Sequence, residues 1–459
     1  MSRPNVTSTY TASPTSAPTS ASQRILAIIG EGATSFTVTE SVVRGAGTSD
    51  ALVHMAVSII RVGNYSTTTD YSSPTDYSLA AGAVSWVIGH GPATGATYWV
   101  TYTYAKAPAD YAPKYFTDYN AILSNYGPIA ATGGVLNAAS YITMAANLAM
   151  GPGIGANQLV IVQLNPAVPG SPLLADFQAA LTTLQQPVAP GNIKPYYIVP
   201  LIGKCSDADA TSVIAASLAH CIQMADPQFL AERRAYSGLK NNATYNSLIS
   251  ALQAFGNVGN SRLTLAANFD PQLTIISGGV QQVVTLDGSF VACALAALRS
   301  TQQVSQPELN KLISSFSNFV TNFTPIQIDS IDNNGGMVLE DVSGVITTVN
   351  DVTVDVASDI EKSIPTVETR DDIIAGVRLQ LKRTVLGLRG DPTVPSKIED
   401  QVDGYLSSRR ASGDISSFSP SHASLKPGST TAYTVSFSYK PAGEVLSITV
   451  NFSIDLNLA

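Results

Sequence analysis

The sequence predicts a chain of several domains that combine α/β and β architecture, and three observations lead to this. The first is its length, because 459 residues exceed what one hydrophobic core usually organises, so two to four domains are expected. The second is a change of pattern along the chain, from an apolar-poor start through a strand-rich aromatic stretch to strands alternating with helices. The third is that only 13% of residues are charged, against about 25% in an ordinary soluble protein. A surface so poor in charge is expected to contact other protein.

Charge and cysteine content exclude several classes of protein. A formal net charge of -8 and a pI near 5.0 argue against a nucleic-acid binder, which needs a basic surface. Cys205, Cys221 and Cys293 are few and far apart, so neither a disulfide framework nor a CxxC metal site is expected. The N-terminus lacks the apolar core of a signal peptide, and no apolar run of about 18 residues is present to span a membrane. We therefore expect a protein made and kept in a cytoplasm, without direct membrane insertion.

Residues 1–24 are expected to form an extended N-terminal arm. Ser, Thr, Ala and Pro dominate there, and three prolines oppose a helix: Pro4, Pro14 and Pro18. At about 3.3 Å per residue the arm could reach on the order of 70 Å, which is enough to cross a neighbouring molecule. A disordered tail is the alternative on composition. The apolar run at 25–32 is expected to be the first buried strand of the central domain.

Residues 33–107 are expected to form an inserted small β-domain, a thin sandwich rich in aromatic side chains. Residues 84–88 and 98–104 alternate apolar and polar positions on either side of a turn that contains Gly and Pro, so they are predicted to pair as a hairpin. The aromatic cluster, which includes Trp86 and Trp99, is expected to pack the core. A carbohydrate-binding platform is the alternative use of such residues.

Residues 108–325 are expected to form a central α/β domain, because apolar strands alternate with amphipathic helices. This alternation indicates an α/β sheet with helices on both faces. The strands are predicted at 158–164, 196–202 and 262–266, and the helices at 171–184, 207–224, 244–255 and 289–299.

Residues 326–459 are expected to form a C-terminal α+β domain that ends in a β-meander. It is predicted to contain a hairpin at 335–349, helices near 369–387 and 395–411, and strands at 414–425, 432–439 and 445–456. The last strand has the clearest period-two pattern in the chain, with six apolar side chains on one face: Leu446, Ile448, Val450, Phe452, Ile454 and Leu456. Full burial of this face is worth on the order of 10 kcal/mol at most, so it must be covered. The cover is either its own meander or a sheet in another chain.

No constellation of residues indicates catalysis, a metal or a cofactor. The four histidines lie in different predicted elements and form no HxxxH or HExxH pattern: His54, His90, His220 and His422. Ser289 lacks the G-x-S-x-G context of a nucleophile, and the glycines at 151–155 precede a strand and lack the Lys-Ser/Thr of a phosphate loop. The paired acids Asp371 and Asp372 are attributed to the dipole of the predicted helix. The chain is therefore not expected to be an enzyme.

One basic cluster occurs in this acidic chain. Arg378, Lys382, Arg383 and Arg389 follow one another with no acidic residue between 378 and 390. Such a cluster could dock an acidic protein surface. The alternative is a solvated face that the negative end of the helix dipole favours.

Several short motifs occur in a fixed order along nearly the whole chain. They are Arg3-Pro4-Asn5-Val6 before the run at 25–32, Asp76-Tyr77 with residues 92–102, residues 290–297 with 306–311, and residues 371–378 with Gly413-Asp414-Ile415 and Tyr439-Lys440-Pro441-Ala442. In this order they resemble the contractile tail sheath proteins of phages and related injection systems. The resemblance implies that the central domain is subtilisin-like in fold but has no catalytic triad.

The resemblance also implies a function and partners. Subunits would assemble as hexameric rings in a helical sleeve around a tail tube, and contraction would drive the tube through the host cell envelope for genome ejection, without a cofactor. The arm, with Pro4, Val6 and Tyr10, and the strand 446–456 would link subunits, and the basic cluster would face the tube. The partners would be other copies of the chain, the tail tube protein, and the baseplate and tail terminator proteins. The chain would be part of the virion, made and assembled in the host cytoplasm.

Two other functions stay open at this point. A carbohydrate-binding tail fibre or adhesin could use the aromatic β-domain, with Trp86 and Trp99 in contact with the sugar. A subtilisin-like hydrolase would need a reactive serine that the sequence does not identify.

Overall fold

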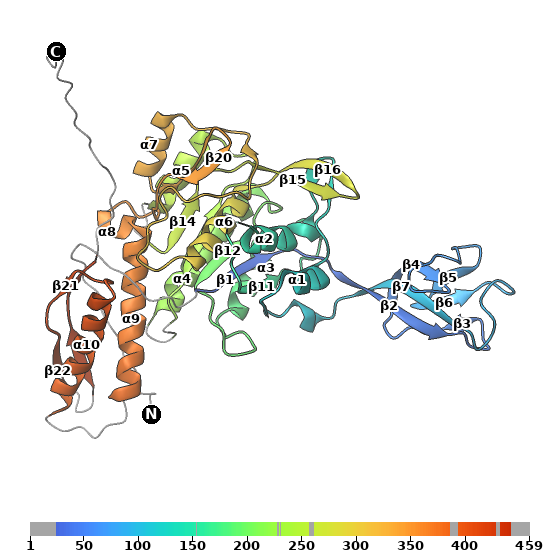
Figure 1. Ribbon diagram of the computed structural model, residues 1–459, viewed down its shortest axis with the longest axis horizontal. Helices are drawn as coiled ribbons and strands as arrows, with labels where there is room; N and C mark the ends of the chain where they lie inside the picture. Colours follow the sequence, from blue (N-terminus) through green and yellow to red (C-terminus); the bar gives the residue numbers. More distant parts are fainter. Residues whose placement is uncertain are drawn as a thin grey trace, which may run out of the picture.

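The structure is a computed structural model, and it describes residues 24–152, 154–226, 229, 231–256, 261–385, 393–427 and 432–441. A seven-stranded sheet lies at its centre, in the order β18-β14-β13-β12-β1-β11-β8 (Figure 1). The strands from β18 to β11 are parallel, and β8 runs antiparallel to β11 at one edge. Their bounds are β1 Leu26–Gly30, β8 Lys114–Phe116, β11 Leu159–Gln163, β12 Tyr197–Pro200, β13 Arg234–Gly238, β14 Leu263–Ala266 and β18 Gly336–Met337.

Strand β1 lies in the middle of this sheet, between β11 and β12, and all five of its residues are buried. Because successive side chains of a strand point to opposite faces, Leu26 and Ile28 enter one core whereas Ala27 and Ile29 enter the other. The apolar run expected as a buried strand is thus the strand that serves both cores.

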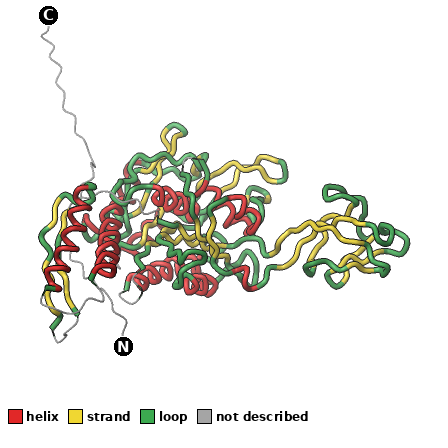
Figure 2. Tube along the Cα trace, turned by 60° about the horizontal axis from the view of Figure 1, so that its bottom comes forward, coloured by secondary structure: helices red, strands yellow, loops and turns green. Residues whose placement is uncertain are grey.

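Helices cover both faces of the sheet, as Figure 2 shows. One core contains side chains of α1 Tyr119–Tyr126, α2 Tyr141–Met150 and α6 Gly288–Thr301. The other contains side chains of α3 Leu174–Thr183, α4 Asp207–Ala225, α5 Tyr245–Gly256 and α7 Pro325–Asn333. Two short 3-10 helices, η1 Pro108–Tyr111 and η2 Ala138–Ser140, precede β8 and α2. The mixed α/β content expected from the sequence is present.

Between β1 and β8 the chain forms two small antiparallel sheets, which project from the central body (Figure 1). One has the order β2-β7-β4 and the other β3-β6-β5, with β2 Ser35–Val43, β3 Ser49–Asp50, β4 Ala56–Gly63, β5 Tyr77–Ala80, β6 Ala83–Trp86 and β7 Thr97–Ala105. They share a separate apolar core that includes Val62, Trp86 and Tyr98.

The hairpin predicted from residues 84–88 and 98–104 is wrong. Strand β6 pairs with β3 and β5, whereas β7 pairs with β2 and β4, so the segment between them passes from one sheet to the other. The true hairpin is β5–β6, closed by Ala81 and Gly82, which both have positive φ (49° and 75°). Positive φ at both turn positions matches the twist of a two-residue hairpin, but Ala81 gives no sequence signal for it.

The predicted hairpin at 335–349 is confirmed as β19 Leu339–Val342 paired with β20 Val345–Thr348. Two further hairpins lie beside each other, β9 Ala131–Thr132 with β10 Val135–Leu136, and β15 Pro271–Ser277 with β16 Val280–Thr285; β17 Asn318–Phe319 also pairs with β15.

The last domain boundary was predicted after residue 325, but several residues beyond it belong to the central body. Strand β18 pairs with β14, and the side chains of Ile331, Val338 and Ile364 lie in the two central cores. A two-residue strand such as β18 is too short to produce a readable pattern.

The C-terminal part consists of a helix pair backed by short strands. Helix α9 (Ile364–Thr384) and helix α10 (Val394–Ala411) correspond to the two predicted helices, but α9 begins five residues earlier because Ser363 and Pro365 start it. Ile373, Val377 and Leu381 of α9 form a fourth core with α10 and the strands. The remaining elements are α8 Asp359–Lys362, β21 Ser417–Phe418, β22 His422–Leu425, β23 Tyr433–Ser436 and β24 Tyr439–Lys440, with β21 paired to β24 and β22 to β23.

Candidate functional site: the ionic joint between the central sheet and helix α9

Most residues that were proposed from the sequence to contact other chains lie outside the described residues. These are the arm residues Pro4, Val6 and Tyr10, the strand residues Leu446, Ile448, Val450, Phe452, Ile454 and Leu456, and Arg389 of the basic cluster. Their roles stay predictions.

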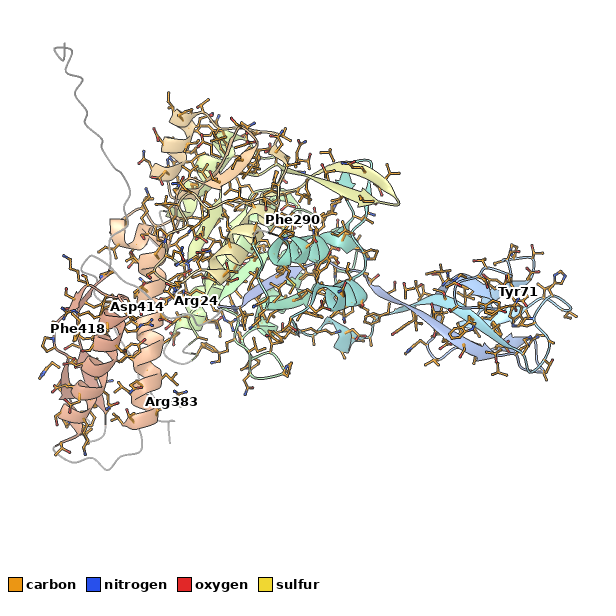
Figure 3. All side chains as sticks on the ribbon, in the orientation of Figure 1. Arg24, Tyr71, Phe290, Arg383, Asp414 and Phe418 are labelled. Atoms are coloured by element: carbon orange, nitrogen blue, oxygen red, sulfur yellow. The ribbon has the colours of Figure 1, made fainter. Side chains whose placement is uncertain are left out.

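The structure divides the rest of the basic cluster. Lys382 and Arg383 are exposed in the last turn of α9, and Figure 3 shows Arg383 near that end of the helix. Arg378 instead faces the central body, where its Nη1 lies 2.5 Å from Oε1 of Glu232 and its side chain is only 11% exposed. Arg378 is therefore engaged within the chain, and only Lys382 and Arg383 present a free basic surface among the described members.

Trp86 and several tyrosines of the β-domain form its core, whereas Trp99 is half-buried and lies outside that core. Trp86 is 4% exposed, and its Nε1 donates to Oδ2 of Asp50 at 2.8 Å. The hydroxyl of Tyr98 donates to the same oxygen at 2.9 Å. Burial alone would raise the pKa of Asp50, but hydrogen bonds from the Gly45 N–H, Trp86 and Tyr98 hold it below its usual value. Trp86 cannot stack on a sugar while it occupies this position.

Ser289 and His220 are not brought together as a nucleophile and its base would be. The hydroxyl of Ser289 donates to Asp287 at the start of α6. His220 contacts Arg233 instead, with Nε2 2.7 Å from Nη1, and burial followed by the charge of Arg233 lowers the pKa of His220 to about 4. Ser289 and His220 thus each have a polar partner other than the other.

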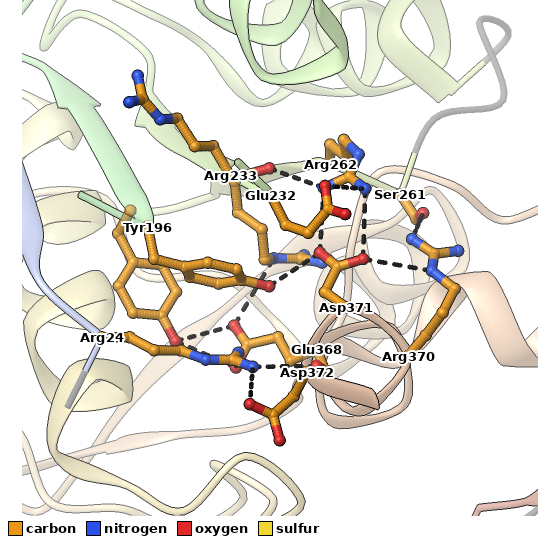
Figure 4. A network of polar contacts seen from close by, with 12 residues as sticks. Arg24, Tyr196, Glu232, Arg233, Ser261, Arg262, Glu368, Arg370, Asp371 and Asp372 are labelled. Carbon is orange, nitrogen blue, oxygen red and sulfur yellow. Dashed lines mark hydrogen bonds and ion pairs between the residues drawn. The ribbon is translucent and has the colours of Figure 1, made fainter. Parts of the chain in front are cut away.

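A large cluster of buried polar side chains was not predicted from the sequence. It is a set of buried ion pairs between α9 and the amino ends of the parallel strands, here called the ionic joint (Figure 4). Glu368, Asp371 and Asp372 are three and four positions apart, so they lie on one face of α9. The opposing residues come just before β1, β12 and β14 or at the start of β13: Arg24, Tyr196, Arg262 and Arg234.

Glu368 is the centre of the ionic joint, and its side chain is 1% exposed. Its Oε2 accepts from Nη1 of Arg24 at 2.7 Å and from Nε of Arg299 at 2.9 Å. Its Oε1 accepts from the hydroxyl of Tyr197 at 3.0 Å and lies 3.7 Å from Nε of Arg234. One carboxylate thus joins the residue before β1, two strands of the sheet and helix α6.

Asp371 forms the second contact with the sheet. It accepts from Nη1 and Nη2 of Arg262 at 3.0 and 3.3 Å, and from the hydroxyl of Tyr196 at 3.0 Å. A two-pronged contact of this kind fixes orientation as well as distance. Burial alone would raise the pKa of Asp371, but Arg262 and then Arg370 lower it to about 2. Asp371 is therefore charged across the physiological range.

Asp372 extends the ionic joint to the second C-terminal helix. It pairs with Arg409 of α10 and lies 3.9 Å from Nη2 of Arg24. Nη1 of Arg409 in turn lies 3.0 Å from Oδ2 of Asp414. The guanidinium of Arg24 also sits over the ring of Tyr196, 4.1 Å from its centroid, where a cation is attracted to the ring face. Arg24 therefore contacts both the sheet and the C-terminal helix pair.

One acid next to the ionic joint lacks such partners. Glu308 is fully buried, and neither oxygen of its carboxyl has a hydrogen-bond partner among the described residues. Burial, and then the charge of Asp351, raise the pKa of Glu308 well above its usual value. Glu308 and Glu368 are thus two buried glutamates in opposite electrostatic surroundings.

The arrangement fixes segments relative to one another rather than performing a reaction. Arginine does not exchange its proton at physiological pH, and no group of three or more His, Cys, Asp or Glu that could hold a metal occurs in the part of the chain that the structure describes. Within the same ranges, no helix is both long and apolar enough to cross a membrane.

The attribution of Asp371 and Asp372 to the helix dipole is wrong. Helix α9 begins at Ile364, so these residues lie two turns inside it and their charges are neutralised by arginines. A usable signal was present, because Arg24 directly precedes one predicted strand and Arg262 is the first residue of another, so both mark the amino edge of the sheet.

Comparison with known proteins decides the fold. Residues 5–152, less than half of the chain, match a family described as a domain of unknown function (DUF4815). A search of the curated proteins finds no match. Among solved structures, the anti-feeding prophage helical sheath in its contracted state matches with a TM-score of 0.58 and 10% identity, over 99% of this chain and 100% of that chain. This chain has the fold of contractile sheath proteins.

Two further structures agree with the sheath fold. The sheath complex of the extracellular contractile injection system PVC, in its contracted state, gives a TM-score of 0.53 at 10% identity, over 100% of this chain and 99% of that chain. A chain of the anti-feeding prophage baseplate gives a TM-score of 0.53 at 12% identity, over 99% of this chain and 100% of that chain. The resemblance to contractile tail sheath proteins is therefore confirmed at the level of the fold, and the ionic joint lies inside that fold.

Proposed function

We propose that the chain is a structural subunit of a contractile sheath, which assembles as hexameric rings in a helical sleeve around a tail tube. Contraction of the sleeve drives the tube through the envelope of the target cell. The observation that carries this proposal is the match to sheath structures over 99% or more of the chain, rather than over one domain. The low proportion of charged residues supports extensive contact with other copies. The proposed further partners are the tube protein, the baseplate and the tail terminator.

Electron microscopy of the purified protein tests the assembly. Rings or sleeves are expected, alone or with the tube. A chain that remains monomeric under all conditions contradicts the proposal. The glycan-binding alternative is not favoured, since Trp86 is buried and bonded to Asp50.

The linkage between subunits is proposed to use both chain ends. The arm with Pro4, Val6 and Tyr10 and the strand at 446–456 would pair with a sheet in neighbouring copies. Strands β22 and β23 support this, because each has a single paired neighbour in the described part of the chain. An edge strand of this kind offers free N–H and C=O groups to an added strand.

Deletion of residues 2–20 is expected to leave a folded monomer but to block sleeve formation. The first described residue with tertiary contacts is Arg24, so the deletion leaves β1 and the ionic joint intact. Thermal unfolding should match that of the full chain, and electron microscopy should find no sleeves. Normal sleeves from the shortened chain contradict the role of the arm.

Charge reversal at Lys382 and Arg383 is expected to weaken attachment to the tube by at least tenfold, without changing stability. Both side chains are exposed, so Lys382→Glu with Arg383→Glu alters the surface alone. Co-sedimentation with assembled tubes measures the effect. The matched control is Lys194→Glu with Lys426→Glu, two exposed lysines elsewhere. Arg378→Glu is expected instead to lower the melting temperature, because it places two acids together at Glu232.

Equal tube binding by the reversed variant and the Lys194/Lys426 control contradicts a tube-facing role for this end of α9. Loss of binding by both variants indicates a general effect of net charge.

A further inference from the structure

The C-terminal helix pair and the central body have separate apolar cores. Among the described residues, the core of the helix pair contains Ile373, Val377 and Leu381 of α9 but no residue of the seven-stranded sheet. The central core reaches α9 only at its first residue, Ile364. Val367, less than a turn later, is also buried, and from Glu368 onward the contacts of α9 with the body include ion pairs and hydrogen bonds of Glu368, Asp371 and Arg378. The described residues between 373 and 441, which are 373–385, 393–427 and 432–441, are here called the C-terminal unit.

This division follows the faces of α9. Glu368 and Asp371 contact residues of the sheet and its edge, Asp372 lies between Arg24 and Arg409 of α10, and Ile373 and Val377 belong to the apolar core shared with α10. A buried ion pair gains little net stability over its separated and hydrated partners, but it demands one orientation. Opening such an interface exposes charged groups that water solvates, whereas opening an apolar interface costs about 25 cal/mol for each Å² exposed. The ionic joint therefore specifies orientation strongly and can open without exposing an apolar core.

Arg24 has a special place in the ionic joint. It is the residue before Ile25 and β1, yet its guanidinium contacts Glu368 through Nη1 at 2.7 Å and the Glu368 carbonyl through Nη2 at 3.0 Å. Nη2 also lies 3.9 Å from Asp372, which pairs with Arg409 of α10. Removal of Arg24 leaves Glu368 with Arg299, Arg234 and Tyr197, so no buried carboxylate is stranded. Arg24 can thus be released without loss of the charge balance around Glu368.

We propose that the C-terminal unit is a separately opening body, held in its orientation by a latch formed by Arg24, Glu368 and Asp372, which reaches the unit through Arg409. The pair of Arg378 with Glu232 is a second polar contact between the unit and the body, so release of the latch weakens this attachment without removing it. One side of the latch is Arg24, which lies just before β1. The other side is Asp372, which pairs with Arg409 in helix α10. When it is released, α9 beyond Asp372, α10 and β22 open together while the sheet stays folded. In an assembled sleeve the latch would lie between the arm and the C-terminal unit. This placement in a sleeve rests on the proposed function, whereas the latch rests only on the contacts within one chain.

Hydrogen exchange of the unassembled chain, followed by mass spectrometry, tests the latch. Arg24→Gln is expected to accelerate exchange at least tenfold in α9 after residue 372 and in α10, with β1, β11 and β12 unchanged. Arg24→Lys should give a smaller acceleration, because it keeps the charge but loses the two-pronged contact. Arg383→Gln is the matched control. It removes an exposed arginine of α9 that lies outside the latch, so it should leave hydrogen exchange unchanged.

Two results overturn the proposal. One is unchanged exchange in Arg24→Gln. The other is equal acceleration in the sheet and the helix pair, which would mean that they open as one unit. If Arg24→Gln does not fold, Asp372→Asn releases the contacts with Arg24 and Arg409 instead and carries the same expectations. Electron microscopy of the wild-type chain tests the proposed function independently, so a chain that never assembles can still show the latch.

Discussion

Glu368→Gln is expected to lower the free energy of unfolding by about 3–5 kcal/mol, the range found when one member of a buried ion pair is removed. The amide keeps the shape of the carboxylate but removes the negative charge that Arg24, Arg234 and Arg299 share. Three buried guanidinium groups then remain close together without their counter-charge. Denaturant unfolding at pH 7, with a folded baseline checked by circular dichroism, measures the loss.

The matched control is Glu308→Gln, which makes the same chemical change at another fully buried glutamate. Neither oxygen of Glu308 has a hydrogen-bond partner among the described residues, and its pKa is raised by burial and then by Asp351. Glu308→Gln is therefore expected to raise the free energy of unfolding at pH 7. A loss for Glu308→Gln equal to that for Glu368→Gln would show that both substitutions act through packing, and would contradict the electrostatic account of the ionic joint.

The difference between Glu308→Gln and the wild type should also depend on pH. A carboxyl whose pKa is raised by folding favours the folded state below its unfolded-state pKa, and this contribution is lost as the pH rises. While folded Glu308 keeps its proton, each pH unit above the unfolded-state value costs the wild type about 1.4 kcal/mol. The advantage of Glu308→Gln should therefore grow from about pH 5 to pH 7, and an advantage that shrinks over this range contradicts the raised pKa.

Gly238→Ala is expected to destabilise the chain by about 3 kcal/mol or more, at the upper end of the range for overpacked cores. A Cβ at Gly238 would lie 2.2 Å from the backbone C and O of Gly288, where the end of β13 meets the start of α6. The Gly288 N–H donates to the Leu239 carbonyl at 2.8 Å, so neither backbone can move away without loss of this bond. Thermal and denaturant unfolding measure the effect.

Gly404→Ala is the control for this substitution and should act in the opposite direction. Gly404 lies inside α10, and a Cβ there meets no atom within 4 Å. Replacement of an exposed helical glycine by alanine stabilises by roughly 1 kcal/mol. A similar loss of stability in both variants would show that the close approach of the Gly288 backbone is not what destabilises Gly238→Ala.

The elements with a strong period or a long apolar run could be predicted from the sequence. Strand β1, strand β11 and helix α4 lie within a few residues of their predicted bounds, because burial on one or both faces sets their pattern. Strand β13 was missed, since its residues Arg234–Gly238 carry no apolar run although all of them are buried. The β6–β7 pairing was predicted wrongly because a local pattern says nothing about which of two sheets a strand joins.

The ionic joint could not be predicted, because its members are far apart in sequence and each has an ordinary local explanation. Arg24 and Glu368 are 344 positions apart, yet the contact between them is the shortest that the Glu368 carboxylate makes. A charged residue in a helix is usually solvated, so Asp371 gave no sign of burial. The basic cluster shows the same limit, since Arg378 and Lys382 share a helix while Arg378 bonds to Glu232 and Lys382 faces solvent.

The central position of β1 sets the order in which the chain can fold during synthesis. Leu26–Gly30 leaves the ribosome first, but its pairing partners begin only at Leu159 and Tyr197. At about 5–20 residues per second, β1 waits on the order of ten seconds before either neighbour emerges. The small β-domain, which closes on itself within residues 35–105, can fold during that interval. An apolar strand that waits unpaired is a site for chaperone binding or aggregation, so β1 is the segment of the newborn chain that most needs protection.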